Sequence, residues 1–250
     1  MPKLVHTLIA AATLALSAAA VSAAPAKPAE QVSAQNPSPK EIRRILREDI
    51  IGDNAVYKLI KGAFPAEYQA FEDQMVAYML SDGFTAQGMQ DRINRFETDI
   101  RETVSPYRKL APDDRLIALA RMQLDTILTL QRGHRRACHE MAENGFLSPQ
   151  SINEIGDDAV PKMLAFSQAG FETAIAGKAA PVKRAGPTPA DDQAIIDEYI
   201  KRGGDPMWIQ AVNTGQGATM TAKARCTNGA LWWQSILAQP NDRIVRVMTR

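Results

Sequence analysis

The chain has 250 residues, of which 45% are hydrophobic, and its 29 Lys and Arg residues nearly balance its 28 Asp and Glu residues. A formal net charge of +1 lacks the basic excess that is typical of nucleic-acid-binding proteins, so no nucleic-acid partner is expected. The length allows one sizeable core, or one core with a small appendage.

The first 23 residues have the pattern of a secretory signal peptide. Lys3 precedes a stretch that is rich in Ala and Leu and contains no acidic residue. The small residues Val21 and Ala23 flank Ser22 in the small-x-small pattern of a signal-peptidase site. We therefore expect cleavage after Ala23 and a periplasmic or secreted mature chain.

An uncleaved anchor helix is the alternative for this segment. Residues 4–23 are long enough to span a bilayer, but they are mostly Ala and include His6 and several hydroxyl side chains, which weaken insertion. No stable membrane span is expected after cleavage. Residues 24–37 are rich in Pro, Ala and polar side chains, and they are predicted to form a disordered tether.

Residues 38–177 are predicted to form the main helical domain. Ser38 and Glu41 form a capping box, with Pro39 at the first helical position. Further helices are expected where Pro or a capping residue opens an apolar run and where Gly closes it. They are expected over 41–51, 54–62, 66–82, 86–104, 113–144 and 157–177.

Residues 178–188 are rich in Gly, Pro and Ala and are predicted to form a linker. Residues 189–250 then form a smaller C-terminal helical lobe, with helices expected over 189–202, around Trp208, over 221–238 and after Pro240. No segment shows convincing strand-period alternation. The predicted fold class is all-α: a multi-helix bundle of about eight or nine helices with this smaller lobe.

The segment QRGHRRACHE, residues 131–140, is the most chemically loaded part of the chain. If the helix over 113–144 is continuous, His134 lies five whole turns after Leu116 on the buried face, and Cys138 follows one turn later. Three side chains then point into solvent as a possible contact surface: Arg132, Arg136 and His139. This phase depends on Gly133 remaining helical, at a cost of about 1 kcal/mol.

Cys226 lies on a second apolar stripe, with Ala230, Trp233 and Leu237 at helical spacing. Two inward-facing cysteines in an exported chain predict a Cys138–Cys226 disulfide. The closed loop has nearly ninety residues, for which the chain-entropy model gives about 4–5 kcal/mol. Trp232 lies at the edge of the stripe, where it either covers the core or adds to a contact surface.

A metal site is the alternative use of the same residues. His134 and Cys138, four residues apart on a helix, could share an ion with Cys226 as a third ligand, as in an open zinc site. Cys138 could also act as an activated thiolate beside the neighbouring histidines and arginines. The predicted disulfide would consume both thiols, so no cofactor is expected and no catalytic residue is assigned.

Three carboxylate doublets, at 113–114, 157–158 and 191–192, each lie near the start of a predicted helix. Acids at these positions bond free N–H groups and favour the helix dipole, so we interpret them as structural.

The sequence therefore predicts an exported helical protein of non-enzymatic type. Its expected role is that of a binding, adaptor or chaperone-like protein of the cell envelope, with a protein partner or an unknown envelope ligand. The alternative is an envelope metal-binding protein or enzyme centred on His134 and Cys138.

Overall fold

The computed structural model describes residues 37–250, which contain helices and no strand. The predicted signal peptide, residues 1–23, and nearly all of the predicted tether, residues 24–37, lie outside the described residues. The all-α prediction is confirmed. The described part has twelve α-helices rather than the expected eight or nine. Two of the additional helices arise because the expected helix over 113–144 is two helices and because a short helix precedes residue 157. In this part of the chain, no helix combines the length and apolarity that a membrane span needs.

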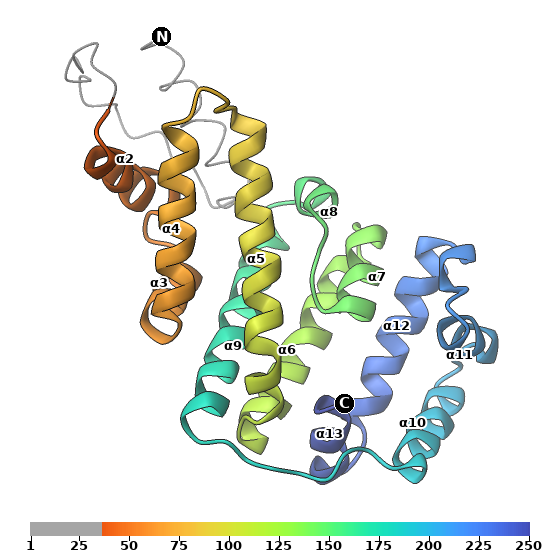
Figure 1. The fold of residues 1–250 in the computed structure, drawn as a ribbon. Coiled ribbons are helices and arrows are strands. Elements are labelled where there is room, and N and C mark those ends of the chain that lie inside the picture. The colour runs from red at the N-terminus through yellow and green to blue at the C-terminus, as the bar shows by residue number, and fades with distance from the viewer. Residues whose placement is uncertain (1–36) are drawn as a thin grey trace. The chain divides into compact units, whose positions relative to one another are not determined.

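The first of two structural units ends at Thr103. It contains α2 (Pro39–Ile45), the π-helix η1 (Leu46–Ile51), α3 (Ala55–Ala63), α4 (Pro65–Met79) and most of α5 (Ala86–Lys109) (Figure 1). Helices α2 and α3 both pack against α4. The rings of Phe71 and Phe96 stack with their centroids 4.1 Å apart, and the Tyr57 ring lies 6.0 Å from each. This aromatic contact joins α3, α4 and α5.

The second unit, Val104–Arg250, is built around α6. It contains α6 (Asp113–Gln131), α7 (Arg135–Asn144), α8 (Pro149–Glu154), α9 (Val160–Ala179), α10 (Pro189–Lys201), α11 (Pro206–Asn213), the 3-10 helix η2 (Gly217–Thr219), α12 (Ala222–Leu237) and α13 (Asn241–Met248) (Figure 1). Helix α6 packs against α7, α9, α12 and α13. Its buried side chains, among them Leu116, Ile127 and Leu130, contribute to both apolar clusters of this unit.

The predicted linker, residues 178–188, is non-helical from Ala180 to Thr188 and lies within the second unit. The Val182 N–H donates to the carbonyl oxygen of Leu110 at 2.8 Å, and Arg184 donates to the Asp113 carboxylate at 2.9 Å. The boundary between the two structural units follows Thr103. The predicted lobe, residues 189–250, shares an apolar cluster with α6, since Leu116 and Ile117 pack with Ile195, Ile236 and Ile244.

The expected continuous helix over 113–144 is wrong. Helix α6 ends at Gln131 and α7 begins at Arg135, with His134 in a non-helical conformation (φ −119°, ψ 66°) between them. The N–H groups of Gly133 and His134 both donate to the carbonyl oxygen of Leu130, which closes the end of α6. Because the helix breaks at Gly133, its phase cannot be carried from Leu116 to residues 134–139.

Candidate functional site

Cys138 on α7 and Cys226 on α12 form a disulfide, with Cα atoms 5.3 Å apart. The predicted pairing is confirmed. Both residues are buried, and 88 positions separate them. Neither sulfur is a thiol in this state, so neither can act as a thiolate nucleophile or as a thiolate metal ligand.

The contact between α7 and α12 is close along its length. A Cβ added at Gly229 would lie 2.6 Å from the Ala142 Cβ, so only glycine fits there at this helix separation. The Trp233 indole N–H donates to the Ala142 carbonyl oxygen at 2.8 Å, and Arg225 donates to the Glu143 carboxylate through both Nε and Nη2. We call these contacts, together with the disulfide, the α7–α12 clamp.

His134 is the N-cap residue of α7 and has a structural partner. Its Nε2 accepts a hydrogen bond from the Gly156 N–H at 3.4 Å and lies 3.9 Å from the Asp158 carboxylate. This hydrogen bond joins the segment before α7 to the segment after α8. The predicted placement of His134 on one helix face with Cys138 is not observed, because His134 lies outside α7.

His139 was expected in solvent, but its side chain is only 12% exposed. Its Nδ1 is buried, has no hydrogen-bond partner among residues 37–250, and lies 3.8 Å from Glu143 Oε2. Burial and the positive charge of Arg225 lower the pKa of His139, although Glu143 opposes this shift. The expectation was wrong because α12 places Arg225 over this side of α7, where it pairs with Glu143 of α7 itself.

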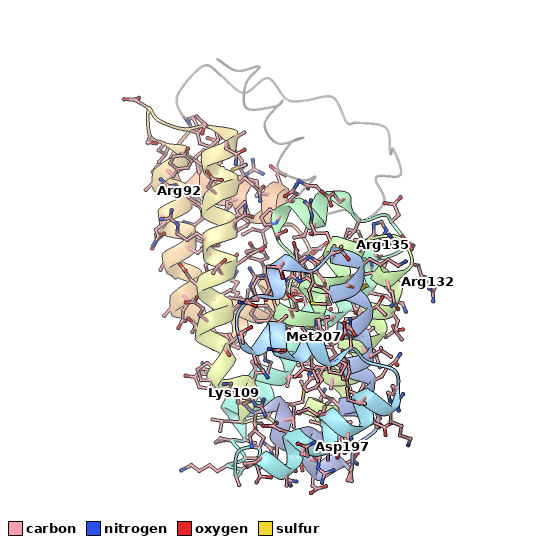
Figure 2. All side chains as sticks on the ribbon, turned by 90° about the vertical axis from the view of Figure 1, so that its right-hand side faces the viewer. Arg92, Lys109, Arg132, Arg135, Asp197 and Met207 are labelled. Atoms are coloured by element: carbon pink, nitrogen blue, oxygen red, sulfur yellow. A yellow bond between two sulfur atoms is a disulfide. The ribbon has the colours of Figure 1, made fainter. Side chains whose placement is uncertain are left out.

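The other three members of the predicted contact surface have different environments. Arg132 is exposed and extends from the end of α6 (Figure 2). Arg136 donates to the Glu154 carboxylate of α8 at 3.0 Å. Trp232 is half-buried, with its ring 5.7 Å from that of Tyr199 and 5.8 Å from that of Trp208. A contact surface made of these residues therefore stays a prediction.

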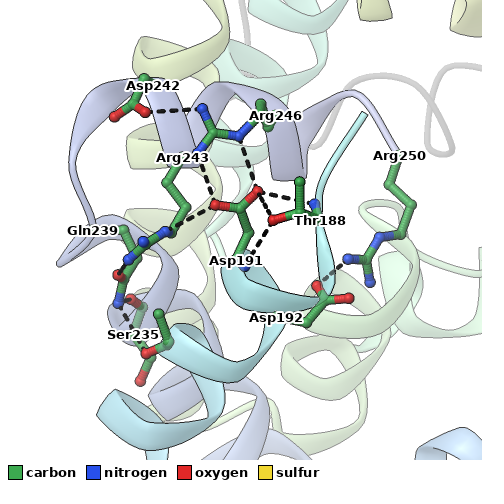
Figure 3. A network of polar contacts seen from close by, with 10 residues as sticks. Thr188, Asp191, Asp192, Ser235, Gln239, Asp242, Arg243, Arg246 and Arg250 are labelled. Atoms are coloured by element: carbon green, nitrogen blue, oxygen red, sulfur yellow. Dashed lines mark hydrogen bonds and ion pairs between the residues drawn. The ribbon is translucent and has the colours of Figure 1, made fainter. Parts of the chain in front are cut away.

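The carboxylate doublets have different structural partners. Asp191 forms the capping box with Thr188 and also accepts from Arg243 and Arg246 (Figure 3). These partners, Arg246 first, hold the pKa of Asp191 far below its usual range. The doublet at 157–158 lies in a turn before α9 and makes no side-chain cap, which differs from the expectation.

Glu72 is a fully buried carboxylate that the sequence analysis did not single out. Arg47 donates to it through Nε at 2.6 Å and Nη2 at 2.5 Å, and Arg43 donates at 3.2 Å. Burial opposes ionisation, but the two arginines outweigh it and lower the pKa of Glu72. The group fastens α2 and η1 to α4. In the sequence, the one indication of this group is an acidic residue on the apolar face of α4.

A shallow hollow of about 180 Å³ lies between α4 and α5. Phe71 and Phe96 contribute aromatic carbon to its lining. Exposed side chains also line it: Glu67, Ala70 and Gln74 of α4, and Arg92, Arg95 and Asp99 of α5. No sequence motif marks this surface, since its residues come from two helices.

None of the protein families, curated proteins or solved structures compared with the chain matches it. Over residues 37–250, no group of three or more His, Cys, Asp or Glu side chains is arranged to hold a metal ion.

Proposed function

We propose that the protein is an exported, non-enzymatic helical protein that binds a protein partner or another ligand of the cell envelope, in an adaptor or chaperone-like role. The Cys138–Cys226 disulfide carries this proposal. Through Cys138, the disulfide makes residues 131–140, the segment richest in candidate chemistry, part of the α7–α12 clamp. Structural disulfides persist in oxidising compartments such as the periplasm.

The partners of the remaining candidate groups support the same interpretation. His134 accepts a hydrogen bond from the chain before α9, and Asp191 caps α10 while pairing with two arginines of α13. Glu72 ties α2 and η1 to α4. Each of these polar side chains has a structural role that requires no substrate.

Metal content and one variant test the non-enzymatic part of the proposal. The protein is purified from the exported fraction without reductant or chelator, and bound metal is measured by plasma mass spectrometry for the wild type and for His134→Ala. We expect no stoichiometric ion in either. The variant should lose only stability, about 1 kcal/mol for the lost hydrogen bond. A stoichiometric ion that His134→Ala releases would favour the metal-dependent alternative instead.

A fusion tests the export part. Residues 1–37 are joined to a reporter enzyme that becomes active only outside the cytoplasm. We expect activity from this fusion and none from a matched fusion of residues 24–37. Equal activity from both, or none from either, would contradict export by this leader.

A further inference from the structure

One face of the α4–α5 hairpin carries positive and negative charges that are separated along its length. We define the hairpin face as Glu67, Ala70 and Gln74 of α4 with Arg92, Arg95 and Asp99 of α5, all exposed. The Phe71–Phe96 stack sets the register of the two helices, and Arg92 lies over the Tyr78 ring at 4.0 Å. Arg92 is therefore at the end nearer the 80–85 turn, whereas Glu67 and Asp99 are at the other end.

Helix geometry gives the scale of this separation. Arg92 and Asp99 are seven residues apart on α5, which is about 10 Å along the helix axis and nearly the same direction around it. Arg95 lies between them, nearer to Arg92. Among residues 37–250, neither Glu67, Arg95 nor Asp99 has a side-chain ion-pair partner. Asp91, at the cationic end, does not line the hollow, and it accepts a hydrogen bond from Gln87.

A surface with one positive end and one negative end is complementary to itself under a two-fold axis through its middle. Such an axis brings the Arg92 and Arg95 end of one copy onto the Glu67 and Asp99 end of the other. We propose that the hairpin face is the contact surface between two copies of this chain. The inference goes beyond the proposed function and does not depend on export.

The centre of the face suits this arrangement. Ala70 is exposed there and has a short side chain, so two backbones can approach, and the Phe71 and Phe96 rings lie beneath as an apolar floor. The two-fold arrangement places opposite charges together at both ends of the face. A different partner would need a negative group opposite Arg92 and Arg95 and a positive group opposite Glu67 and Asp99.

The dimer should be weak and sensitive to salt. Helix α4 has 15 residues, or about 22 Å, so a face two helices wide buries roughly 400 Å² per copy, below the standard size for stable complexes. Pairs between exposed charges are screened when the ionic strength rises. Association is therefore expected at tens to hundreds of micromolar protein in low salt.

A charge-swap experiment tests this proposal on the full mature chain with its disulfide intact. One variant carries Arg92→Glu and Arg95→Glu, and a second carries Glu67→Lys and Asp99→Lys. Sedimentation velocity measures the mass of each alone and of their equimolar mixture. We expect the wild type to dimerise, each variant alone to be monomeric because like charges meet, and the mixture to dimerise again because opposite charges meet.

A control separates the surface from net charge and from folding. Lys40→Glu with Lys223→Glu makes the same change in net charge as Arg92→Glu with Arg95→Glu, at exposed side chains outside the hairpin face, and it should dimerise like the wild type. Circular dichroism confirms that each variant is folded. If a double variant unfolds, the single variants Arg95→Glu and Asp99→Lys take its place, each measured alone and in an equimolar mixture. Neither of these residues stacks on Tyr78. A wild type that stays monomeric at low salt, or a mixture that stays monomeric while the wild type dimerises, would overturn the proposal.

Discussion

The indole N–H of Trp233 donates a hydrogen bond to the carbonyl oxygen of Ala142, 91 positions earlier in the chain, at 2.8 Å. This bond joins α12 to α7, the same two helices that the Cys138–Cys226 disulfide links. Polar, covalent and close-packing contacts therefore act together at one helix pair.

Removal of the disulfide should lower stability strongly. The double substitution Cys138→Ala and Cys226→Ala opens a loop of 88 residues in the unfolded chain, and loss of such a crosslink typically costs about 2–5 kcal/mol. Urea denaturation measures the change. The reduced wild type is the control and should lose a similar amount. A loss below about 0.5 kcal/mol would show that the crosslink does not hold the fold.

Gly229→Ala should destabilise the protein by about 1–3 kcal/mol, because the new Cβ meets that of Ala142 at 2.6 Å and forces the helices apart. Ala142→Gly in the same chain should recover part of the loss, which a double-mutant cycle measures. The matched control is Gly170→Ala in α9, where a Cβ meets nothing within 4 Å. That control should be neutral or stabilising by up to about 1 kcal/mol. Equal effects at the two glycines would refute the close contact.

Asp191→Asn should reduce the acid sensitivity of the fold. Because Arg246, Thr188 and Arg243 hold the pKa of Asp191 well below its ordinary value of 3.8, the folded state favours the ionised carboxylate. This stabilisation is present above that value and is lost as the pH falls through and below it. The midpoint of thermal unfolding, measured from pH 2 to 6, should fall less steeply with acid in the variant. Parallel curves would mean that the four-residue network does not stabilise the fold.

His139 should make the protein less stable below neutral pH. Burial and Arg225 lower its pKa from 6.5, so the unfolded chain takes up a proton at a higher pH than the folded chain does. The contribution of the neutral ring is therefore full above pH 6.5 and is lost as the pH falls below it. His139→Gln should flatten the stability curve between pH 5 and 7, measured by denaturant unfolding at each pH. An unchanged slope would contradict the buried environment of Nδ1.

Local signals predicted most of the helices. Ser38 accepts from the Glu41 N–H at the start of α2, and Thr188 with Asp191 forms a capping box. Such caps depend on residues only a few positions apart, so the sequence displays them directly. Glycine is unfavourable in a helix interior, so Gly133 marked a weak position in the helix predicted over 113–144, and the chain does break there.

The site was less predictable because its environment is set over long distances in the chain. The disulfide could be predicted because the chain has two cysteines, which allow one pairing, and because export favours their oxidation. The helix phase that was expected to turn Cys138 inward does not hold, since the helix breaks at Gly133. The burial of His139 depends on Arg225, 86 positions later, and that of Glu72 depends on Arg43 and Arg47 of α2 and η1. Helical periodicity describes one helix at a time, so neither partner could be assigned from it.

Intact mass spectrometry of the exported protein, prepared without reductant or chelator and compared under native and denaturing conditions, tests the central claim most directly. We predict a chain that starts near Ala24, is two hydrogens lighter than the fully reduced sequence, and carries no metal. That result would establish export and the Cys138–Cys226 bond together. A chain with both thiols free, or with one bound ion that is lost on denaturation, would contradict the structural role assigned to residues 131–140.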